Sequence, residues 1–431
     1  MDRKVKYNNF YISTLGCAKN TVDSEVLLGK LEKAGLHPVK NPDDAEVIII
    51  NTCGFIQDAK QESIDAIMEA VSLKENGQIK KIIVMGCLSE RYQEELSQEI
   101  PEVDQFLGVE KFDKVLEELE IDPLIGNRSL LTPGHYAYLK IAEGCDNNCS
   151  FCAIPDIRGS QRSIKIEDLL EEAQYLAEQG VKELIIIAQD TTRYGTDIYG
   201  EPALVELLSE LLELDIFPRV RLMYTNPDYW DEELKDLFAK YDSLCSYLDF
   251  PVQHASNRIL NLMNREKTKE EIQQIIRNLR ERNSRIAIRT TVMVGFPGET
   301  EEDFKELLDF VKQMKFERLG VFCYSEEEDT EAADFEDNIP EKIKEERRDK
   351  IMEVQNEISQ EFARGQVGKE ITVLIDDQIN NEFIGRTEWD APEVDCKVYI
   401  PKQDGIEVGD YITAKITAFQ DIDLRAELKS I

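Results

Sequence analysis

Short apolar runs alternate with amphipathic helical patterns over most of the chain, and this alternation is the strongest constraint on the fold. Within residues 9–120 the strand-like runs are Phe10–Leu15, Val47–Ile50 and Ile82–Met85, and a fourth unit follows at 103–120. Helical patterns follow the runs at Val22–Ala34, Gln57–Ser72 and Glu90–Glu99. Such alternation is typical of a parallel sheet with helices packed on it. We therefore predict an N-terminal domain, residues 8–122, built on a doubly wound parallel sheet.

A second alternating series fills residues 136–345, after a Pro- and Gly-rich stretch at Ile121–Gly134 that reads as a domain junction. Its candidate strands are Ala137–Ala142, Glu183–Gln189, Arg219–Tyr224, Tyr247–Pro251, Arg285–Val294 and Arg318–Tyr324. Helical patterns fall between them, as at Ile166–Gln179 and Glu299–Met314. Six strand–helix units favour an open α/β barrel over residues 131–362, with its site at the carboxyl ends of the strands.

The last part of the chain, residues 366–431, has a different character. A charged amphipathic helix, Glu345–Arg364, leads into it as a connector. Short β-prone runs broken by Gly, Pro and Asp then follow, at Ile371–Ile375, Phe383–Arg386, Cys396–Ile400 and Tyr411–Phe419. This pattern predicts a small antiparallel β-barrel of the type that binds nucleic acid or protein.

The balance of charge limits the choice of partner. The 431 residues include 51 Lys and Arg against 87 Asp and Glu, a net charge of −36. So acidic a chain argues against a broad phosphate-binding surface and fits a basic partner better. Residues 366–431 are themselves acidic, with 7 basic and 14 acidic side chains. No apolar run approaches the roughly 20 residues that span a bilayer, and the start lacks an apolar signal core. We expect no membrane association and a cytoplasmic protein.

Three closely spaced cysteines carry the strongest chemical signal. Cys145, Cys149 and Cys152 have C-x3-C-x2-C spacing, just after an apolar run that ends at Ala142. Thiolates hold iron–sulfur clusters, and a tight loop brings them to one point. Three protein ligands would leave one iron of a four-iron cluster open. A zinc site is the alternative, but such sites bring a fourth Cys or His nearby, and none follows closely here.

Three further cysteines occupy equivalent places in the N-terminal domain. Cys17, Cys53 and Cys87 each come directly after a predicted strand. The carboxyl ends of parallel strands share one edge of a sheet, where ligands bind, so these residues can converge. The alternative is that each is a small buried residue, as free cysteines often are. Three at equivalent positions favour a second cluster, again with an open iron. Cys245, Cys323 and Cys396 lie in or beside strand-like runs, and we expect them to pack.

The loop at 145–152 resembles the signature of the radical S-adenosylmethionine (SAM) enzymes, in which an aromatic residue often precedes the third cysteine, as Phe151 does here. The resemblance implies that the open iron chelates SAM and that reduction yields a 5′-deoxyadenosyl radical. It also suggests SAM-contacting residues at strand ends: Gln189 and Asp190, Gln253, and Arg265. Capping or surface roles are the alternatives. Arg289 lies within an apolar strand, so it points into the barrel as a cofactor contact or pairs with a carboxylate.

The whole chain is similar to the radical-SAM methylthiotransferases. The similar stretches are LGCAKNTVDSE at 15–25, NTCGFIQDAKQES at 51–63, EGCDNNCSFCAIPDIRG at 143–159, QDTTRYGTDIYG at 189–200, FPVQHASNRILNLMNR at 250–265, VGFPGETEEDF at 294–304, GVFCYSEEEDT at 320–330 and WDAPEVD at 389–395. Departures at Val252 and Cys396, where Leu and Gly are expected, touch none of the six cysteine ligands. The resemblance implies two 4Fe–4S clusters, SAM, and a C-terminal TRAM barrel, with no catalytic residue beyond the cluster ligands.

Within that family the stretches resemble most the members that place a methylthio group on the β-carbon of an aspartate in small-subunit ribosomal protein S-twelve. Other members modify an adenosine of transfer RNA. The acidic C-terminal barrel favours the basic protein, free or in the ribosome, and disfavours nucleic acid as the main substrate. The sequence identifies neither the sulfur donor nor the electron donor, and it leaves the oligomeric state open.

Overall fold

The computed structural model describes residues 6–121 and 128–428, which divide into two compact units. The first contains residues of the range 1–131 together with Gly144–Asp146 and Cys152–Ser160. The second contains Thr132–Glu143, Asn147–Phe151 and Gln161–Ile431. Part of the junction expected at Ile121–Gly134, residues 122–127, lies outside the described residues.

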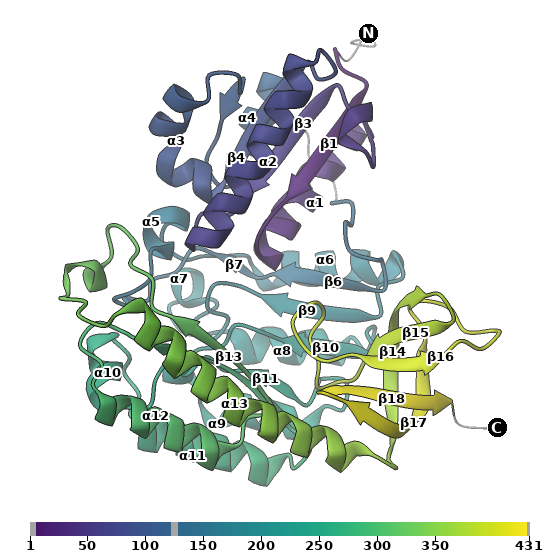
Figure 1. The fold of residues 1–431 in the computed structure, drawn as a ribbon. Helices are drawn as coiled ribbons and strands as arrows, with labels where there is room; N and C mark the ends of the chain where they lie inside the picture. The colour runs from purple at the N-terminus through teal and green to yellow at the C-terminus, as the bar shows by residue number, and fades with distance from the viewer. Residues whose placement is uncertain (1–5, 122–127, 429–431) are drawn as a thin grey trace. The chain divides into compact units, whose positions relative to one another are not determined.

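The first unit is a five-stranded parallel sheet with the strand order β2-β1-β3-β4-β5. The strands are β1 (Asn9–Thr14), β2 (His37–Pro38), β3 (Val47–Thr52), β4 (Lys81–Gly86) and β5 (Gln105–Phe106). The helices are α1 (Ala18–Lys33), α2 (Gln57–Glu75), α3 (Cys87–Glu99), α4 (Phe112–Glu118) and α5 (Ile154–Arg158). Figure 1 shows α2 running along the strands β1, β3 and β4.

Two apolar cores lie on opposite faces of this sheet. Side chains of α1 and α4 pack on one face, where Leu31 and Leu116 are fully buried. Those of α2 and α3 pack on the other, around Ile67 and Ile82. Every residue of β3 is buried, as expected for a central strand covered on both sides. The predicted doubly wound sheet is confirmed. Helix α1 begins four residues before the predicted Val22, because its first turn buries polar residues that break the apolar pattern.

The second unit contains two three-stranded parallel sheets, β6-β9-β10 and β11-β12-β13, which an isolated bridge between Val220 and Leu244 joins. The strands are β6 (Tyr136–Lys140), β9 (Glu183–Ile187), β10 (Arg219–Leu222), β11 (Tyr247–Asp249), β12 (Ala287–Val294) and β13 (Arg318–Cys323), with a short β7 (Ala142–Glu143) and β8 (Arg162–Ser163) hairpin. Because β6 and β13 do not pair with each other, the six strands form the open barrel that the sequence predicts.

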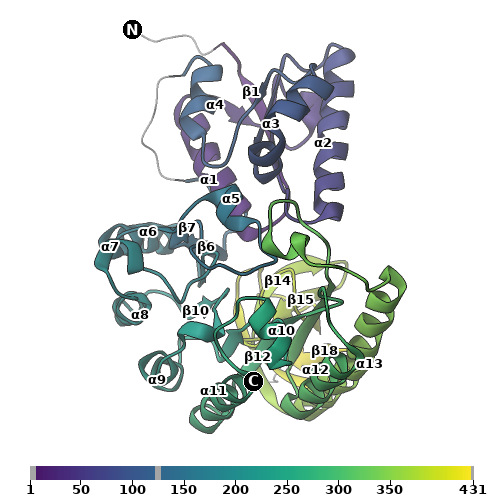
Figure 2. The ribbon, with the colours of Figure 1, turned by 90° about the vertical axis from the view of Figure 1, so that its left-hand side faces the viewer.

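Helices surround these strands on the outside, as Figure 2 shows. They are α6 (Ile166–Glu178), α7 (Thr196–Tyr199), α8 (Leu204–Glu213), α9 (Glu232–Lys240), α10 (Asn257–Leu262), α11 (Lys269–Arg282), α12 (Glu301–Met314) and α13 (Glu341–Gln366), with 3-10 turns at Pro227–Tyr229 and Glu331–Asp334. A further 3-10 turn, Pro42–Asp44, lies in the first unit. Thr268 and Thr300 form capping boxes that start α11 and α12. No helix within the described ranges is both long and apolar enough to cross a membrane.

A closed five-stranded barrel ends the second unit. It contains β14 (Glu370–Ile379), β15 (Glu382–Arg386), β16 (Val398–Pro401), β17 (Tyr411–Gln420) and β18 (Asp423–Leu428), in the order β14-β15-β16-β18-β17. The sequence predicted the first four strands and missed β18. In β18 the buried Leu424 and Ala426 alternate with exposed charged residues, so it carries too little apolar signal alone.

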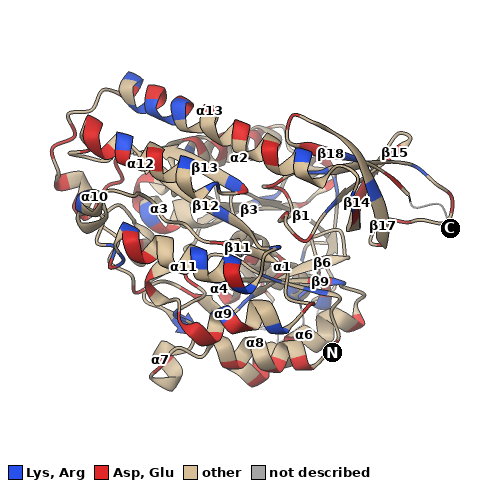
Figure 3. Cartoon of the chain, turned by 90° about the horizontal axis from the view of Figure 1, so that it is seen from below, with Lys and Arg blue, Asp and Glu red and all other residues tan. Residues whose placement is uncertain are grey.

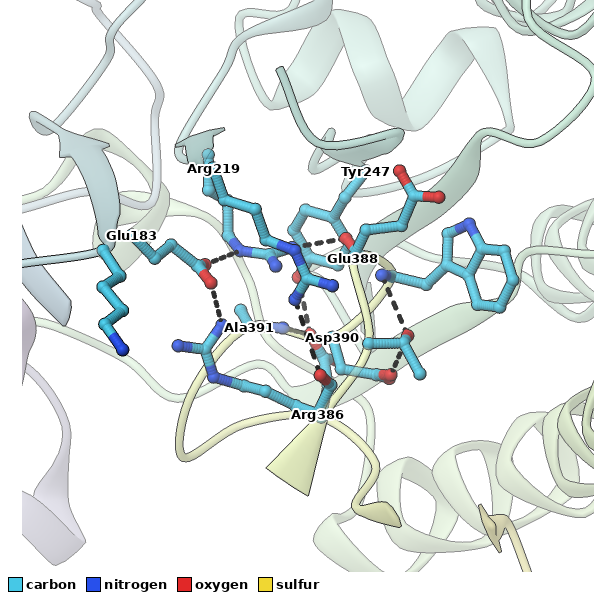
Figure 4. Close-up of polar contacts among 12 residues, drawn as sticks. Glu183, Arg219, Tyr247, Arg386, Glu388, Asp390 and Ala391 are labelled. Atoms are coloured by element: carbon cyan, nitrogen blue, oxygen red, sulfur yellow. Dashed lines mark hydrogen bonds and ion pairs between the residues drawn. The ribbon is translucent and has the colours of Figure 1, made fainter. Parts of the chain in front are cut away.

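Buried ion pairs join this small barrel to the amino ends of the open-barrel strands, as Figure 4 shows. Glu183, the first residue of β9, is fully buried. Its carboxylate accepts hydrogen bonds from Arg221 of β10 at 2.8 Å and from Arg386 of β15 at 2.5 Å. Burial alone would raise the pKa of Glu183, but the two guanidinium groups outweigh it and lower that pKa to about 2.

The WDAPEVD stretch at 389–395 supplies further buried contacts at the same end. Asp390 accepts from Arg318, the first residue of β13, at 3.0 Å. Asp395 accepts from the Tyr247 hydroxyl of β11 at 2.7 Å. Glu388, just before the stretch, accepts at its backbone oxygen from Arg221 at 2.9 Å. This stretch therefore fixes the small barrel to the open barrel.

Candidate metal centres

The structure places the three N-terminal cysteines at the carboxyl edge of the first unit's sheet. Cys17 is the N-cap of α1, Cys53 directly follows β3, and Cys87 opens α3 after β4. Tight turns make this placement possible. Gly16 has a φ of +89°, and a Cβ atom there would lie 2.7 Å from the Cβ and 2.9 Å from the Sγ of Cys53. A side chain at Gly16 would therefore enter the space that the thiol occupies.

Neighbouring groups shift the pKa of two of these thiols. The pKa of Cys87 is raised to about 11, chiefly by burial; Arg158 opposes this shift, and Cys17 and Cys53 add to it. Burial and Cys17 also raise the pKa of Cys53. Three free thiols that lie close together in a protected site are suited to bind a metal group as thiolates. The residues present thus fit a cluster with three protein ligands.

The second triad lies in the loop after β7. Within the second unit, Asn147 of this loop is held at three points: its amide nitrogen donates to Asp190 at 2.6 Å, and its side-chain oxygen accepts from Arg193 and Tyr229, each at 3.2 Å. Asp190 in turn accepts from the backbone nitrogen of Thr192 at 2.9 Å. Asp190 follows β9, so this network ties the cysteine loop to a strand end.

Arg265 brings a buried cation to the same loop. Its guanidinium donates to the Sγ of Cys149 at 3.7 Å and to the Oδ1 of Asn226 at 2.6 Å, and it pairs with Asp228 at 3.6 Å. The side chains of Arg265 and Asp228 are 8% and 5% exposed, so the guanidinium is fixed, not a surface charge. The sequence argument named Arg265 and Asp190. It missed Asn147 and Asn226, whose only signal was their place inside a loop or strand end.

Three of the remaining predicted SAM contacts lie at or near the cysteine loop or a strand end of the open barrel. Phe151 packs beside the apolar cluster of Met263, Phe296 and Tyr324. Gln253 follows β11 with a φ of +67°, held there because its backbone nitrogen donates to Thr291 at 2.9 Å and its backbone oxygen accepts from Met293 at 2.7 Å. Such backbone strain in a non-glycine residue is common at functional sites. Gln189 is half-buried directly before Asp190.

Arg289 does not join this group. It is the third residue of β12, near the amino end, and donates to Asp249 at 2.8 Å while pairing with Asp395 at 3.6 Å. The carboxylate pairing that the sequence argument allowed is therefore present, and a cofactor contact for Arg289 stays a prediction. Cys245 and Cys396 are buried, and Cys323 is partly buried.

The spacing of the sulfur atoms helps to distinguish a zinc ion from an iron–sulfur cluster. In the described part of the chain, the three Sγ atoms of the N-terminal triad do not all lie within 4.8 Å of one another. A zinc ion binds sulfur at roughly 2.3 Å, so its ligands must lie closer together than that. A four-iron cluster spaces its thiolates more widely than a zinc ion does, so the N-terminal triad is less suited to zinc.

The comparisons with known proteins agree with this fold. Residues 139–311 match the radical SAM superfamily, 367–428 match the TRAM domain, and 9–108 match a family described as uncharacterized protein family UPF0004. Two solved structures share the fold at 15% and 13% identity: the radical SAM methyltransferase TsrM from Kitasatospora setae (TM-score 0.55, 73% of each chain) and the cobalamin-dependent radical SAM enzyme OxsB (TM-score 0.54, 83% of this chain and 56% of that one). The second unit thus defines a radical-SAM protein with a TRAM barrel.

Relatives of known name are similar over nearly their full length. Ribosomal protein uS12 methylthiotransferase RimO of Clostridioides difficile is 48% identical over 97% of this chain and 98% of its own. The RimO of Christiangramia forsetii is 46% identical over 99% and 95%. The chain belongs to the RimO family of radical-SAM methylthiotransferases, and the fold and class predicted from the sequence are confirmed.

Proposed function

We propose that this protein inserts a methylthio group at the β-carbon of an aspartate in ribosomal protein uS12. The observation that carries the proposal is the joint presence of two cysteine triads in a full-length relative of RimO proteins. Modification of a transfer RNA adenosine, which other methylthiotransferases perform, is not favoured. The chain would be divided into an N-terminal domain (8–122), a radical-SAM domain (131–362) and a TRAM barrel (366–431). The reaction would take place in the cytoplasm.

Six cysteines would hold the two 4Fe–4S clusters: Cys145, Cys149 and Cys152 in one, and Cys17, Cys53 and Cys87 in the other. When bound, the first cluster supplies an electron to SAM and so a radical that removes hydrogen from an unactivated carbon. The second is the point at which sulfur would be delivered. The chain's own residues bind, orient and protect these groups.

The network around the cysteine loop would orient the reacting groups. Asp190 fixes Asn147 within the loop, and Arg265 holds the Cys149 sulfur, so this thiolate would be set before SAM arrives. Arg265, Gln189, Asp190, Gln253 and Phe151 would line the SAM site. A buried, ordered surround also limits water, which protects a carbon radical from side reactions.

Charge supports a basic protein as the substrate. The net charge of −36 favours association with a basic partner through complementary potentials. Figure 3 shows acidic and basic positions interleaved along α12 and α13, so these helices present no purely basic face. A broad surface of Lys and Arg, which would bind the phosphates of transfer RNA, is not what this composition favours.

A paired assay tests the proposal. The reconstituted enzyme would be incubated without oxygen with SAM and a reductant, together with either the uS12 protein or bulk transfer RNA. Mass spectrometry would then read one added methylthio group. We expect modification of an aspartate in the protein and none in the RNA. Modification of the RNA alone would overturn the choice of substrate while leaving the radical chemistry intact.

A further inference from the structure

A buried arginine lies against the N-terminal triad, and neither the proposed mechanism nor the sequence motifs assigned it a role. Arg158 ends helix α5, six residues after Cys152 in the chain, and this segment belongs to the first compact unit. Its side chain is 1% exposed. Lone cations are rarely buried so completely without partners, so its contacts indicate what it does.

The guanidinium joins two acceptors of α1 to a cysteine. It donates to the Asn20 side-chain oxygen at 2.5 Å and pairs with Asp23 at 3.4 Å. It also lies close enough to Cys87 to lower the pKa of that thiol. Ile157, the preceding residue, packs with Cys87, Val109 and Ala153 in one small apolar cluster, which fixes the end of α5 on the start of α3.

Asn20 extends these contacts to the other two cysteine turns. Its amide nitrogen donates to the backbone oxygens of Leu15, at 2.7 Å, and Thr52, at 3.0 Å. Those two residues come shortly before Cys17 and directly before Cys53. Through Cys87 and Asn20 together, Arg158 is therefore connected to all three turns that carry the triad.

We propose that Arg158 is a positioning residue for the iron–sulfur cluster of the N-terminal triad, and that it raises the reduction potential of that cluster. The inference rests on the proposed function, which places a cluster at Cys17, Cys53 and Cys87. Hydrogen bonds to ligand sulfurs and nearby charge are the two levers by which a protein sets such a potential. Arg158 is a fixed cation beside this triad, so its charge would stabilise the reduced, more negative cluster.

The test measures the potential of this cluster alone. In the full chain, Cys145, Cys149 and Cys152 would all be replaced by Ala, which leaves one triad to bind iron. A redox titration followed by electron paramagnetic resonance would then compare this background with Arg158→Met and Arg158→Lys added to it. We expect the midpoint potential to become more negative in Arg158→Met, and less so in Arg158→Lys, which keeps the charge but not the planar donor geometry.

Arg128→Met is the matched control. Arg128 is a buried arginine of the same unit that pairs with Glu25 of α1, at 3.7 Å. Like Arg158, it is buried and pairs with an acidic residue of α1. Its variant should keep the potential of the background. Iron present in both Arg158 variants at an unshifted potential would overturn the inference alone. A background that binds no iron would overturn the proposed cluster, and the inference with it.

If Arg158→Met loses its iron, the Lys variant still gives a result. A Lys variant that keeps its iron and has the potential of the background would contradict the proposal. A shifted potential with an unchanged circular dichroism spectrum would support it, because a purely structural role would not move the potential of a cluster that still assembles.

Discussion

The amino and carboxyl ends of the open-barrel strands both carry buried charged side chains, but these side chains have different roles. At the amino ends, Glu183 and Arg221 are fully buried and close a network with the small barrel. At the carboxyl ends, Arg265 is buried too, but one of its acceptors is a cysteine sulfur in the loop that we propose holds a cluster. Barrels of this kind carry chemistry at the carboxyl ends and stability at the other. The predictions below test whether the two ends can be separated by mutation.

The largest effect is expected from removing a thiol at the carboxyl end. Cys149→Ala should abolish the cleavage of SAM to 5′-deoxyadenosine, because the cluster loses one of three ligands. Cys53→Ala should keep that cleavage and lose sulfur insertion. Chromatography of 5′-deoxyadenosine and mass spectrometry of uS12 would measure both. Methylthiolation retained in Cys53→Ala would contradict the division of roles between the triads.

Cys245→Ala is the control at the other end of the barrel. Cys245 is buried before β11, near Arg221 and Glu183. The same change there should leave iron content and SAM cleavage intact. Loss of cleavage in this variant would mean that the two ends do not act separately.

The next effect is on stability, at the amino end. Glu183→Gln leaves Arg221 and Arg386 without their shared carboxylate, and breaking a buried pair of this kind costs roughly 3–5 kcal/mol. Urea unfolding of the apoprotein should show the loss, while the folded variant still cleaves SAM. Arg425→Met breaks an exposed pair with Glu382, in which both side chains are 44% exposed, and should cost less than about 1 kcal/mol. Equal losses in the two variants would contradict a special role for burial.

A smaller effect is expected from the arginine at the carboxyl end. Arg265→Lys keeps the charge but loses the geometry that reaches Cys149 and Asn226, so SAM cleavage should fall by about 10- to 100-fold. Arg289→Lys makes the same change near the amino end, where the carboxylate of Asp249 is the partner at 2.8 Å. SAM binding, followed by isothermal titration calorimetry, should weaken in the first variant. Weakening in Arg289→Lys as well would show that Arg289 also contacts the cofactor.

The sequence predicted the strands, the layering and the placement of the N-terminal triad because each depends on local patterns. The apolar runs predicted where the strands end, so three cysteines that each follow a strand were expected at the same edge of the sheet. The partners of Arg265 and Glu183 were not readable, because Asn226, Arg386 and Asp228 become neighbours only when distant segments pack. Arg158 was hidden for the same reason. It lies next to the loop motif in sequence, but its partners come from α1 and α3.

Two buried glutamates sharpen the comparison through pH. Glu183 has a folded pKa lowered to about 2, so its stabilisation is present above the unfolded value of 4.5 and is lost as the pH falls from 4.5 toward 2. Glu299, which follows β12 at the carboxyl end, has a pKa raised to about 7, chiefly by burial, although Arg347 opposes the shift. Its protonated form favours the folded state, so stability should fall as the pH rises from 4.5 to 7.

Urea unfolding of the wild type, Glu183→Gln and Glu299→Gln at pH 3, 5 and 7.5 would separate the two glutamates. The deficit of Glu183→Gln should shrink toward pH 3, because the unfolded wild type binds a proton there that the folded state does not. Between pH 5 and 7.5 the free energy of unfolding of Glu299→Gln should rise relative to the wild type, by on the order of 1–3 kcal/mol. If the free energy of unfolding of both variants changed with pH in the same direction relative to the wild type, the two buried carboxylates would not have oppositely shifted pKa values. The amino and carboxyl ends would then not be electrostatically distinct.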